Sequence, residues 1–372
     1  MKYILSARSW VALFAVLLST SVLNSAEEMK PGPMISEASF PIVSEFIYEL
    51  EDRLTPQCHS STIVETESGL VASWFGGTHE KNKDVGIWVS RHIDGKWGKP
   101  FEVVNGVQSM DLRYPTWNPV LFQPSIGPLL LFYKVGPDPR TWWGMLTTSE
   151  DDGQTWSWPT KLGEHFRIGP LLGPIKNKPI ELADGTLIAP TSYEIELEDG
   201  TDIWDVHFEI SSDGGSTWDL VGPIADPEGL GAIQPSILTY PNGDMQVLCR
   251  SRKGVVAQSW SRDGGRNWEP MSATTLPNPN SGTDAVTLAD GRQLIVYNHS
   301  VRRGEFPANR SVLNVAISDN GIDWEQFLTL ERQEGEFSYP SVIQGSDGRV
   351  HITYTYLRET VKYVSFDARD IP

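Results

Sequence analysis

Short apolar and β-branched runs alternate with polar turns along most of the chain, and this pattern predicts many short strands and very little helix. Each of six turns holds a glycine, with one β-rich run before it and another after it. The residues at these turns, mostly Asn-Gly or Asp-Gly, supply the positive φ that a tight hairpin needs. The six glycines lie 48–58 residues apart, at Gly69, Gly127, Gly185, Gly243, Gly291 and Gly348. The pattern therefore predicts six units, each opening with two antiparallel strands.

A second repeat, Ser-x-Asp-x-Gly-x-Thr-Trp, falls out of phase with the first. Its copies end at Trp156, Trp218, Trp268 and Trp324, and Ser90 to Trp97 is a degenerate first copy. The Asp is expected to accept backbone N–H bonds within the turn, the Gly to take the left-handed conformation, and the Trp to fill the space between neighbouring sheets. We therefore interpret these turns as structural, and not as catalytic aspartates or calcium loops.

Four strands per unit, repeated six times, predict an all-β fold: a six-bladed β-propeller with four-stranded antiparallel blades. Because a closed ring of repeats grows as one unit, residues 27–372 are predicted to form one domain. The sixth unit, from about Ser338, is short and lacks the Asp-containing turn. The segment from Phe40 to Leu50 is expected to supply its outer strand, which would close the ring and cover the exposed sheet edges.

The first 26 residues have the composition of a secretory signal. Lys2 and Arg8 give a basic start, an apolar run follows from Trp10 to Leu18, and the small residue Ala26 precedes an acidic pair. Such a run is too short to span a bilayer as a mature helix. We expect a secreted or periplasmic protein, with no membrane insertion after the signal is removed.

The charge balance narrows the range of partners. With 48 acidic against 30 basic residues and a net charge of −18, nucleic acid and anionic membranes are disfavoured. An anionic substrate would have to be held by a few local Arg or Lys residues. The two cysteines, Cys58 and Cys249, either form one disulfide or are two buried thiols, and the sequence leaves both open.

In a propeller, the residue that opens each innermost strand faces the central funnel. We place these positions about nine residues before each glycine, at His59, Asn118, Lys178, Gln234, Asp284 and Tyr339. All six are polar, and polar groups gathered at the narrow end of a ring are costly unless they are hydrated or used. A ligand site and a water-filled channel both fit this pattern.

The Asp-containing turns identify a resemblance to the sialidase superfamily, whose Asp-box repeats they match over the whole mature chain. The resemblance implies a sugar-cleaving site with an arginine triad for a carboxylate, a Tyr nucleophile paired with a Glu, and an Asp acid/base. Tyr339 resembles the nucleophile, and Arg250 and Arg310 resemble the second and third arginines. Asp84 matches the acid best, and Glu80 is its rival.

Two positions depart from the family pattern. His59 stands where the first arginine is expected, and Gln234 stands where the Glu that activates the Tyr is expected. A Gln side chain cannot take a proton from a phenol, so Tyr339 would need help from other groups. Lys176 and Lys178 are expected to add positive charge for an anionic sugar. Trp142 and Trp143 are either stacking platforms at the rim or packing between blades.

Three functions remain open on the sequence. The first is an exo-acting glycoside hydrolase that cleaves a terminal acidic sugar, of the sialic acid or uronic acid type, from glycans. It would use Tyr339 and Asp84, with His59 beside them, and would bind substrate through Arg250, Arg310, Gln234, Asp284, Lys178 and Asn118. The second is a polysaccharide lyase on uronate glycans, with His59 and Tyr339 as the proton-transfer pair. The third is a non-catalytic glycan-binding propeller. The seven dispersed His residues form no metal-ligand motif, so we expect neither a metal nor another cofactor.

Overall fold

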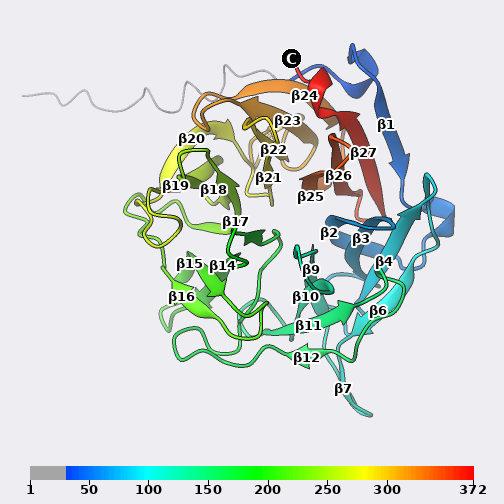
Figure 1. The fold of residues 1–372 in the computed structure, drawn as a ribbon, viewed down its shortest axis with the longest axis vertical. Coiled ribbons are helices and arrows are strands. Elements are labelled where there is room, and N and C mark those ends of the chain that lie inside the picture. The colour runs from blue at the N-terminus through cyan, green and yellow to red at the C-terminus, as the bar shows by residue number, and fades with distance from the viewer. Residues whose placement is uncertain (1–30) are drawn as a thin grey trace, which may run out of the picture. The chain divides into compact units, whose positions relative to one another are not determined.

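Residues 31–372 are described by a computed structural model, and the predicted signal peptide, residues 1–26, lies outside the described residues. Within residues 31–372, six antiparallel sheets surround a central axis, each with its first strand toward the centre (Figure 1). The predicted six-bladed β-propeller is confirmed. The helical elements of this range are three 3-10 turns, η1 (Ile35–Glu37), η2 (Leu50–Asp52) and η3 (Ala368–Asp370). In the same range no helix is long and apolar enough to cross a membrane.

The first three blades follow one another along the chain. Blade 1 contains β2 (Gln57–Thr66), β3 (Gly69–Gly77), β4 (Gly86–Ile93) and β5 (Lys96–Trp97), and β6 (Phe101–Asn105) also pairs with β4. Blade 2 contains β9 (Thr116–Phe122), β10 (Leu129–Val135), β11 (Trp143–Ser149) and β12 (Thr160–Lys161). Blade 3 contains β13 (Ile180–Glu181), β14 (Leu187–Glu196), β15 (Asp202–Ser211) and β16 (Asp219–Val221). Between blades 1 and 2, β7 (Val107–Ser109) and β8 (Leu112–Arg113) form a separate ribbon.

The next three blades complete the ring. Blade 4 contains β17 (Ala232–Thr239), β18 (Met245–Ser251), β19 (Val255–Ser261) and β20 (Ser272–Pro277). Blade 5 contains β21 (Asp284–Thr287), β22 (Gln293–Asn298), β23 (Val312–Ser318) and β24 (Glu325–Arg332). Blade 6 contains β25 (Phe337–Gln344), β26 (Arg349–Tyr356), β27 (Thr360–Asp367) and β1 (Ile42–Phe46).

The ring closes through the N-terminal strand. β1 pairs antiparallel with β27, with Ile42 opposite Phe366 and Phe46 opposite Lys362. The prediction that the segment Phe40 to Leu50 supplies the outer strand of the last blade is therefore confirmed. Joining the two ends of the chain in one sheet leaves no free edge on β27 and ties blade 6 to the start of blade 1.

The Asp-containing turns are self-contained hydrogen-bond networks, as predicted. In the turn of blade 3, Asp213 accepts bonds from the Ser211 hydroxyl at 2.8 Å, the Thr217 N–H at 2.8 Å and the Thr217 hydroxyl at 2.6 Å. These bonds lower the pKa of Asp213 to about 2, and the Thr217 hydroxyl has the largest effect. Trp218 then packs edge-on against Phe132 of the neighbouring blade, with ring centroids 6.2 Å apart.

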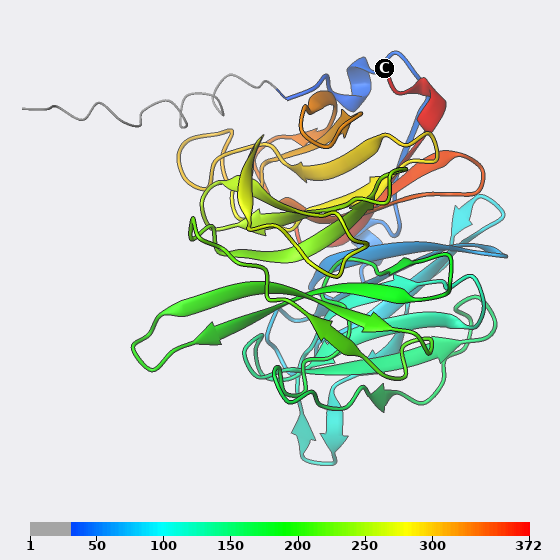
Figure 2. The same ribbon diagram turned by 60° about the vertical axis from the view of Figure 1, so that its left-hand side comes forward.

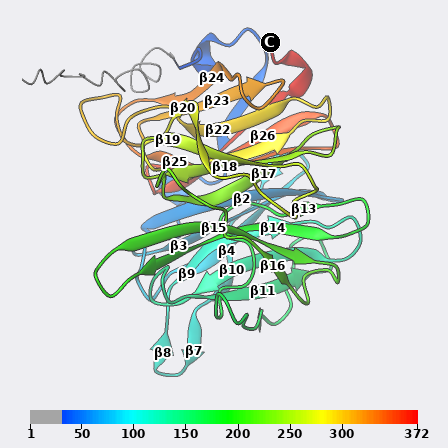
Figure 3. The same ribbon diagram turned by 90° about the vertical axis from the view of Figure 1, so that its left-hand side faces the viewer.

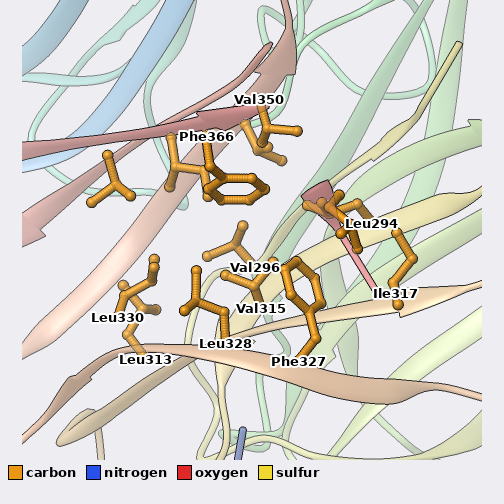
Figure 4. Close-up of a cluster of buried hydrophobic side chains, with 14 of the residues drawn as sticks. Leu294, Val296, Leu313, Val315, Ile317, Phe327, Leu328, Leu330, Val350 and Phe366 are labelled. Carbon is orange, nitrogen blue, oxygen red and sulfur yellow. The ribbon is translucent and has the colours of Figure 1, made fainter. Parts of the chain in front are cut away.

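Apolar residues from neighbouring blades fill the spaces between the sheets. The largest cluster joins blades 5 and 6 through β22, β23, β24, β26 and β27, and Figure 4 shows side chains such as Val296, Val315, Leu328 and Phe366 facing one another. All four of these side chains are fully buried. This packing holds the blades in register, so the starts of the innermost strands are fixed relative to one another.

The two cysteines are free and buried, which decides between the two alternatives left open by the sequence. Cys58 packs with Ile63 and Trp74 near the junction of blades 6 and 1, whereas Cys249 lies in the apolar cluster of blades 3 and 4. Burial raises the pKa of the Cys58 thiol to about 12. The cysteines therefore act as small apolar side chains in two separate parts of the core.

One hairpin extends past the others. β14 and β15 pair over ten residues each, from Leu187 opposite Ser211 to Glu196 opposite Asp202. Figures 2 and 3 show this green hairpin projecting beyond the neighbouring strands. Its far end therefore stands clear of the sheet and is placed to form a wall above the start of the next blade.

Candidate functional site

The starts of the innermost strands share an unusual backbone. In blades 1, 2, 4 and 6 the first strand is bulged near its start, where its register with the second strand shifts. Residues other than glycine rarely adopt a positive φ, and strained residues of this kind gather at functional sites. Five blades carry such a residue nine positions before the hairpin glycine, with φ between 39° and 72°, at Ser60, Asn118, Lys176, Gln234 and Tyr339.

The strict nine-residue count corrects the predicted register in three blades. The prediction followed the residue that precedes a proline or an apolar run, which displaced it by one residue in blade 1 and by two residues in blades 3 and 5. A shift of one residue turns a side chain to the other face of a strand, and a shift of two moves it along the strand. The equivalent positions are Ser60, Lys176 and Gly282, although His59, one residue before Ser60, still lies against Tyr339.

Gly282 shows that these positions converge. A Cβ atom added to Gly282 would lie 3.3 Å from Gln234 Oε1, from Lys176 Cε and from Tyr339 Cδ2. These three side chains come from blades 4, 3 and 6, and they meet at the backbone of blade 5. The absence of a side chain at residue 282 therefore makes room for the other three at the floor of the funnel.

Tyr339 stands at the centre of this group, with 8% of its surface exposed. Its hydroxyl oxygen accepts a hydrogen bond from Arg250 Nη1 at 2.6 Å and a longer one from Gln234 Nε2 at 3.4 Å. The Arg310 guanidinium lies 5.2 Å from the centre of its ring, and the His59 ring lies 4.1 Å away. The structure therefore brings together Tyr339, Arg250, Arg310, Gln234 and His59, as the sequence predicted.

A cavity of about 440 Å³ opens beside Tyr339, and three arginines line it: Arg250, Arg302 and Arg310. Asn280 also lines this cavity and accepts a bond from Arg250 Nε at 2.8 Å. The cavity volume lies within the usual range for small-molecule sites, which is about 300–1,000 Å³. Guanidinium groups bind carboxylates through two parallel hydrogen bonds, so the cavity is suited to a small anion.

A fourth arginine, which the strand pattern did not reveal, lies beside His59. Arg358 lies in the turn between β26 and β27, and its Nη2 is 3.4 Å from His59 Nε2. Glu336 Oε1 accepts bonds from Arg358 Nε at 3.0 Å and from Arg310 Nη1 at 2.7 Å. Burial works against the charge of Arg358, but Glu336 and Glu80 outweigh it and raise its pKa. Glu336 thus holds two guanidiniums side by side.

His59 is a neutral partner in this group. Burial is the main reason that its pKa lies well below the usual value, and the charges of Arg358, Arg310, Arg250 and Lys176 lower it further. Its Nδ1 lies 3.2 Å from the Thr355 hydroxyl. His59 therefore packs against Tyr339 and adds no positive charge to the site.

Lys176 reaches across the floor of the funnel. Its buried ammonium donates to the carbonyl oxygens of Thr283 at 2.6 Å and Pro340 at 2.5 Å, which belong to blades 5 and 6. Burial lowers the pKa of Lys176 to about 7, although the charge of Asp284 opposes this shift. Lys176 thus joins three blades beneath the tyrosine.

Lys178 and Asp284 form a structural pair away from the arginine cavity. Lys178 Nζ donates to Asp284 Oδ2 at 2.9 Å, and the same carboxylate accepts bonds from the Ser236 hydroxyl and the Val342 N–H. The pair lines a separate cavity of about 150 Å³ with residues of β17 and β21. Both carboxylate oxygens are engaged by protein groups, so the predicted contact of this pair with substrate is replaced by a link between blades.

The two candidate acids in the loop after β3 have different surroundings. Asp84 accepts three hydrogen bonds from Thr78, the shortest at 2.6 Å from the hydroxyl, and so closes its own loop. Glu80 Oε2 accepts a bond from Arg358 Nη1 at 2.7 Å. Glu80 is therefore tied into the arginine group, whereas every side-chain bond of Asp84 is made within its loop.

The remaining predicted residues are Asn118, at the start of an innermost strand, and two tryptophans that pack against other rings. Asn118 has the lowest positive φ of the group, 39°, and is buried at the start of blade 2. Trp142 is 5% exposed and packs edge-on against Trp117, with ring centroids 5.7 Å apart. Trp143 packs in the same way against Tyr114 at 5.6 Å. Both tryptophans pack against other aromatic rings, which supports the packing interpretation.

The repeats place the chain within a known family. Residues 68–352 match the BNR repeat-like domain, which covers most of the chain. The chain belongs to the BNR repeat-like family. This assignment agrees with the Asp-containing turns and with the propeller fold, and it leaves the reaction to be argued from the residues of the site.

Solved structures show the same BNR repeat-like fold at low sequence identity. A protein of unknown function from Dyadobacter fermentans is similar with a TM-score of 0.69 and 17% identity, over 87% of this chain and 98% of that one. Hadza microbial sialidase Hz136 is similar with a TM-score of 0.71 and 19% identity, over 89% and 69%. The intramolecular trans-sialidase from Ruminococcus gnavus is similar with a TM-score of 0.64 and 15% identity, over 86% and 96%.

Sequence reasoning also missed several residues around the cavity. Glu336 could have been found from the sequence, because it directly precedes the first strand of blade 6, which carries Tyr339. Arg302 and Arg358 lie in turns, where the alternation of residues along a strand does not predict which way a side chain points. Within residues 31–372, no group of three or more His, Cys, Asp or Glu side chains is arranged to hold a metal ion.

Proposed function

We propose that this chain is an exo-acting glycoside hydrolase that removes a terminal acidic sugar, of the sialic acid or uronic acid type, from glycans. The observation that carries the proposal is the gathering of Arg250, Arg310 and Arg358 around the hydroxyl and ring of Tyr339 and the neighbouring His59. Guanidiniums gathered in this way favour a carboxylate, and a terminal sugar fits the cavity of about 440 Å³ that Arg250 and Arg310 line.

The same arrangement suits bond cleavage at the anomeric carbon. Tyr339 presents its oxygen at the floor of the site, where it can attack that carbon or stabilise its developing positive charge. Arg250 donates to this oxygen at 2.6 Å, and a donor placed there stabilises negative charge on it. The likeness in fold to a sialidase and an intramolecular trans-sialidase supports this direction.

The test is a screen of aryl glycosides of sialic and uronic acids. We expect the wild-type protein to release the aryl alcohol from at least one of them, and Tyr339→Phe to lower kcat/KM by roughly 10²–10⁴-fold. Tyr240→Phe is the matched control, because Tyr240 bonds to Gln246 at the other end of its blade. Equal activity of wild type and Tyr339→Phe would overturn the role given to Tyr339.

The same screen separates two other functions. A lyase acting through His59 and Tyr339 would form a new C=C bond, which absorbs in the ultraviolet, with no water added. The contact of His59 Nε2 with Arg358 leaves that nitrogen poorly placed to take a proton from substrate, which favours hydrolysis. Binding of acidic sugars without any turnover would instead identify a glycan-binding propeller that has lost its chemistry with the Gln at position 234.

We also propose that the protein is exported. The support is the basic start, apolar run and small residues of the first 26 positions. Mass spectrometry of protein recovered from the periplasm or medium would show a new N-terminus near Ala26, whereas an intact N-terminus on cytoplasmic protein would contradict export.

A further inference from the structure

Glu194 stands out among the carboxylates of the site wall because its side chain has no hydrogen-bond or ion-pair partner within residues 31–372. It lies near the far end of β14 and is half-buried, whereas Glu196 two residues on pairs with Arg140. A half-buried carboxylate that no protein group of this range holds can bond to a ligand bound beside it.

Strand geometry places Glu194 beside the tyrosine site. Residues two apart on a strand share a face, and Ser192, on the same face as Glu194, accepts a bond from the Gln234 N–H at 3.2 Å. Glu194 is therefore directed toward blade 4, one step further out from the floor than Gln234.

The neighbour across the strand pair gives the same placement. Trp204 of β15 is directly opposite Glu194, and such pairs have Cβ atoms about 5 Å apart. The Arg250 guanidinium lies 5.3 Å from the centre of the Trp204 ring, and Arg250 also donates to Tyr339. Glu194, Trp204 and Arg250 thus form one continuous wall that ends at the tyrosine hydroxyl.

The charges around Glu194 leave it able to carry a proton. Burial is the main cause of a raised pKa, Asp202 raises it further, and Arg250, Arg252 and Arg140 oppose the shift. A carboxyl with a raised pKa stays protonated to higher pH than usual, which is what a general acid needs.

A second cavity begins at the same residue. It holds about 290 Å³ and is lined by Glu194 with Arg140, Trp142, Arg167 and Tyr193. Glu194 therefore lines this cavity and belongs to the wall that continues through Trp204 to Arg250. An acidic sugar at the arginines with its remaining glycan toward the second cavity would place the glycosidic oxygen near this carboxyl.

We propose that Glu194 is the general acid and base of the site, the carboxyl that donates a proton to the leaving glycosidic oxygen. This inference rests on the hydrolase function proposed above. The bond between the anomeric carbon and the glycosidic oxygen breaks, its electron pair stays on that oxygen, and the oxygen takes the proton of Glu194 and leaves as an alcohol. Water then bonds to the anomeric carbon and gives a proton back to the Glu194 carboxylate.

Leaving-group dependence tests this role. For a glycoside with a poor leaving group, such as the methyl glycoside, Glu194→Gln should lower kcat/KM by roughly 10²–10⁴-fold. For the 4-nitrophenyl glycoside of the same sugar, whose leaving group needs little protonation, the loss should be small. The alkaline limb of the wild-type pH profile, which reports loss of the acid's proton, should disappear in the variant.

Matched variants separate this role from others. Glu196→Gln removes a carboxyl from the same strand that is paired with Arg140, and it should keep the wild-type leaving-group dependence and pH limb. Asp84→Asn tests the acid predicted from the sequence. Glu194→Ala, with its melting temperature measured, should regain turnover when formate is added, because a small carboxylic acid can enter the space.

The outcomes distinguish the two proposals. No turnover of any acidic glycoside by the wild-type protein overturns the hydrolase function, and the role of Glu194 with it. Turnover by wild type with an unchanged leaving-group dependence in Glu194→Gln, or with the signature appearing in Asp84→Asn instead, overturns the role of Glu194 alone.

Discussion

The Asp-containing turns and the funnel floor are both built from polar residues that recur blade by blade, but they differ in how those residues are satisfied. Asp151, Asp213 and Asp263 each find a full set of bonds within their own turn, and their pKa values fall to about 2 because of hydrogen bonds from the residue four positions on. At the floor, the corresponding residues differ from blade to blade, and Lys176, Gln234 and Tyr339 bond to groups of other blades. The repeated Asp-containing turns stabilise the fold, whereas the floor residues, which differ from blade to blade, form the candidate site.

A substitution in a repeated turn is expected to lower stability and leave catalysis unchanged. Trp218→Ala should destabilise the protein by about 3–5 kcal/mol, because it removes a large buried ring between blades 2 and 3. Denaturant unfolding measures the loss, and kcat of the folded protein should stay unchanged. Trp158→Ala is the control, since Trp158 is 89% exposed. A loss of kcat without a loss of stability would contradict the structural role.

A substitution at the funnel floor is expected to affect catalysis. Arg250→Ala should lower kcat/KM on an acidic glycoside by roughly 10²–10³-fold, because it removes a buried charged donor from Tyr339 and from the substrate carboxylate. Steady-state kinetics measure the effect. Arg262→Ala removes an exposed arginine of the same blade and should leave kcat/KM unchanged. Similar kinetics for the two variants would show that the cavity does not bind substrate.

The smallest expected effect concerns the lysine beneath the tyrosine. The pKa of Lys176 is lowered to about 7 by burial, so above that pH the folded protein holds fewer protons at this position than the unfolded chain, in which lysine titrates near 10.4. The lysine's contribution to stability therefore rises with pH from about 7 toward 10. Thermal melts at pH 7 and 9 should show a rise in wild type that is smaller in Lys176→Met. An equal pH dependence in both proteins would contradict this pKa.

The fold was readable from the sequence because its signals are local. Hairpin glycines and Asp-containing turns need only neighbouring residues, and even the closing strand near Phe40 could be inferred from the short last unit. The predicted residues of blades 3 and 5, Lys178 and Asp284, were each two residues too far along the chain. They had been chosen because a proline or an apolar run follows them, whereas the count of nine residues back from the hairpin glycine gives the equivalent position in every blade.

The site was only partly predictable because its contacts join distant parts of the chain. Arg358 and His59 are 299 residues apart in sequence, and Arg250 and Tyr339 are 89 apart. The residues that open the innermost strands could be located by counting back from each hairpin glycine, and this count identified Tyr339 and Gln234. Arg358 lies in a turn and Glu194 near the end of a long hairpin, and their direction follows from packing between blades.

The central claim is that the guanidiniums around Tyr339 bind the carboxylate of an acidic sugar. A crystal soaked with a mixture of sialic and uronic acids tests it most directly. We expect sugar density with its carboxylate between Arg250, Arg310 and Arg358 and its anomeric carbon facing the Tyr339 hydroxyl. Sugar bound only elsewhere on the propeller, or a carboxylate turned away from these arginines, would contradict it.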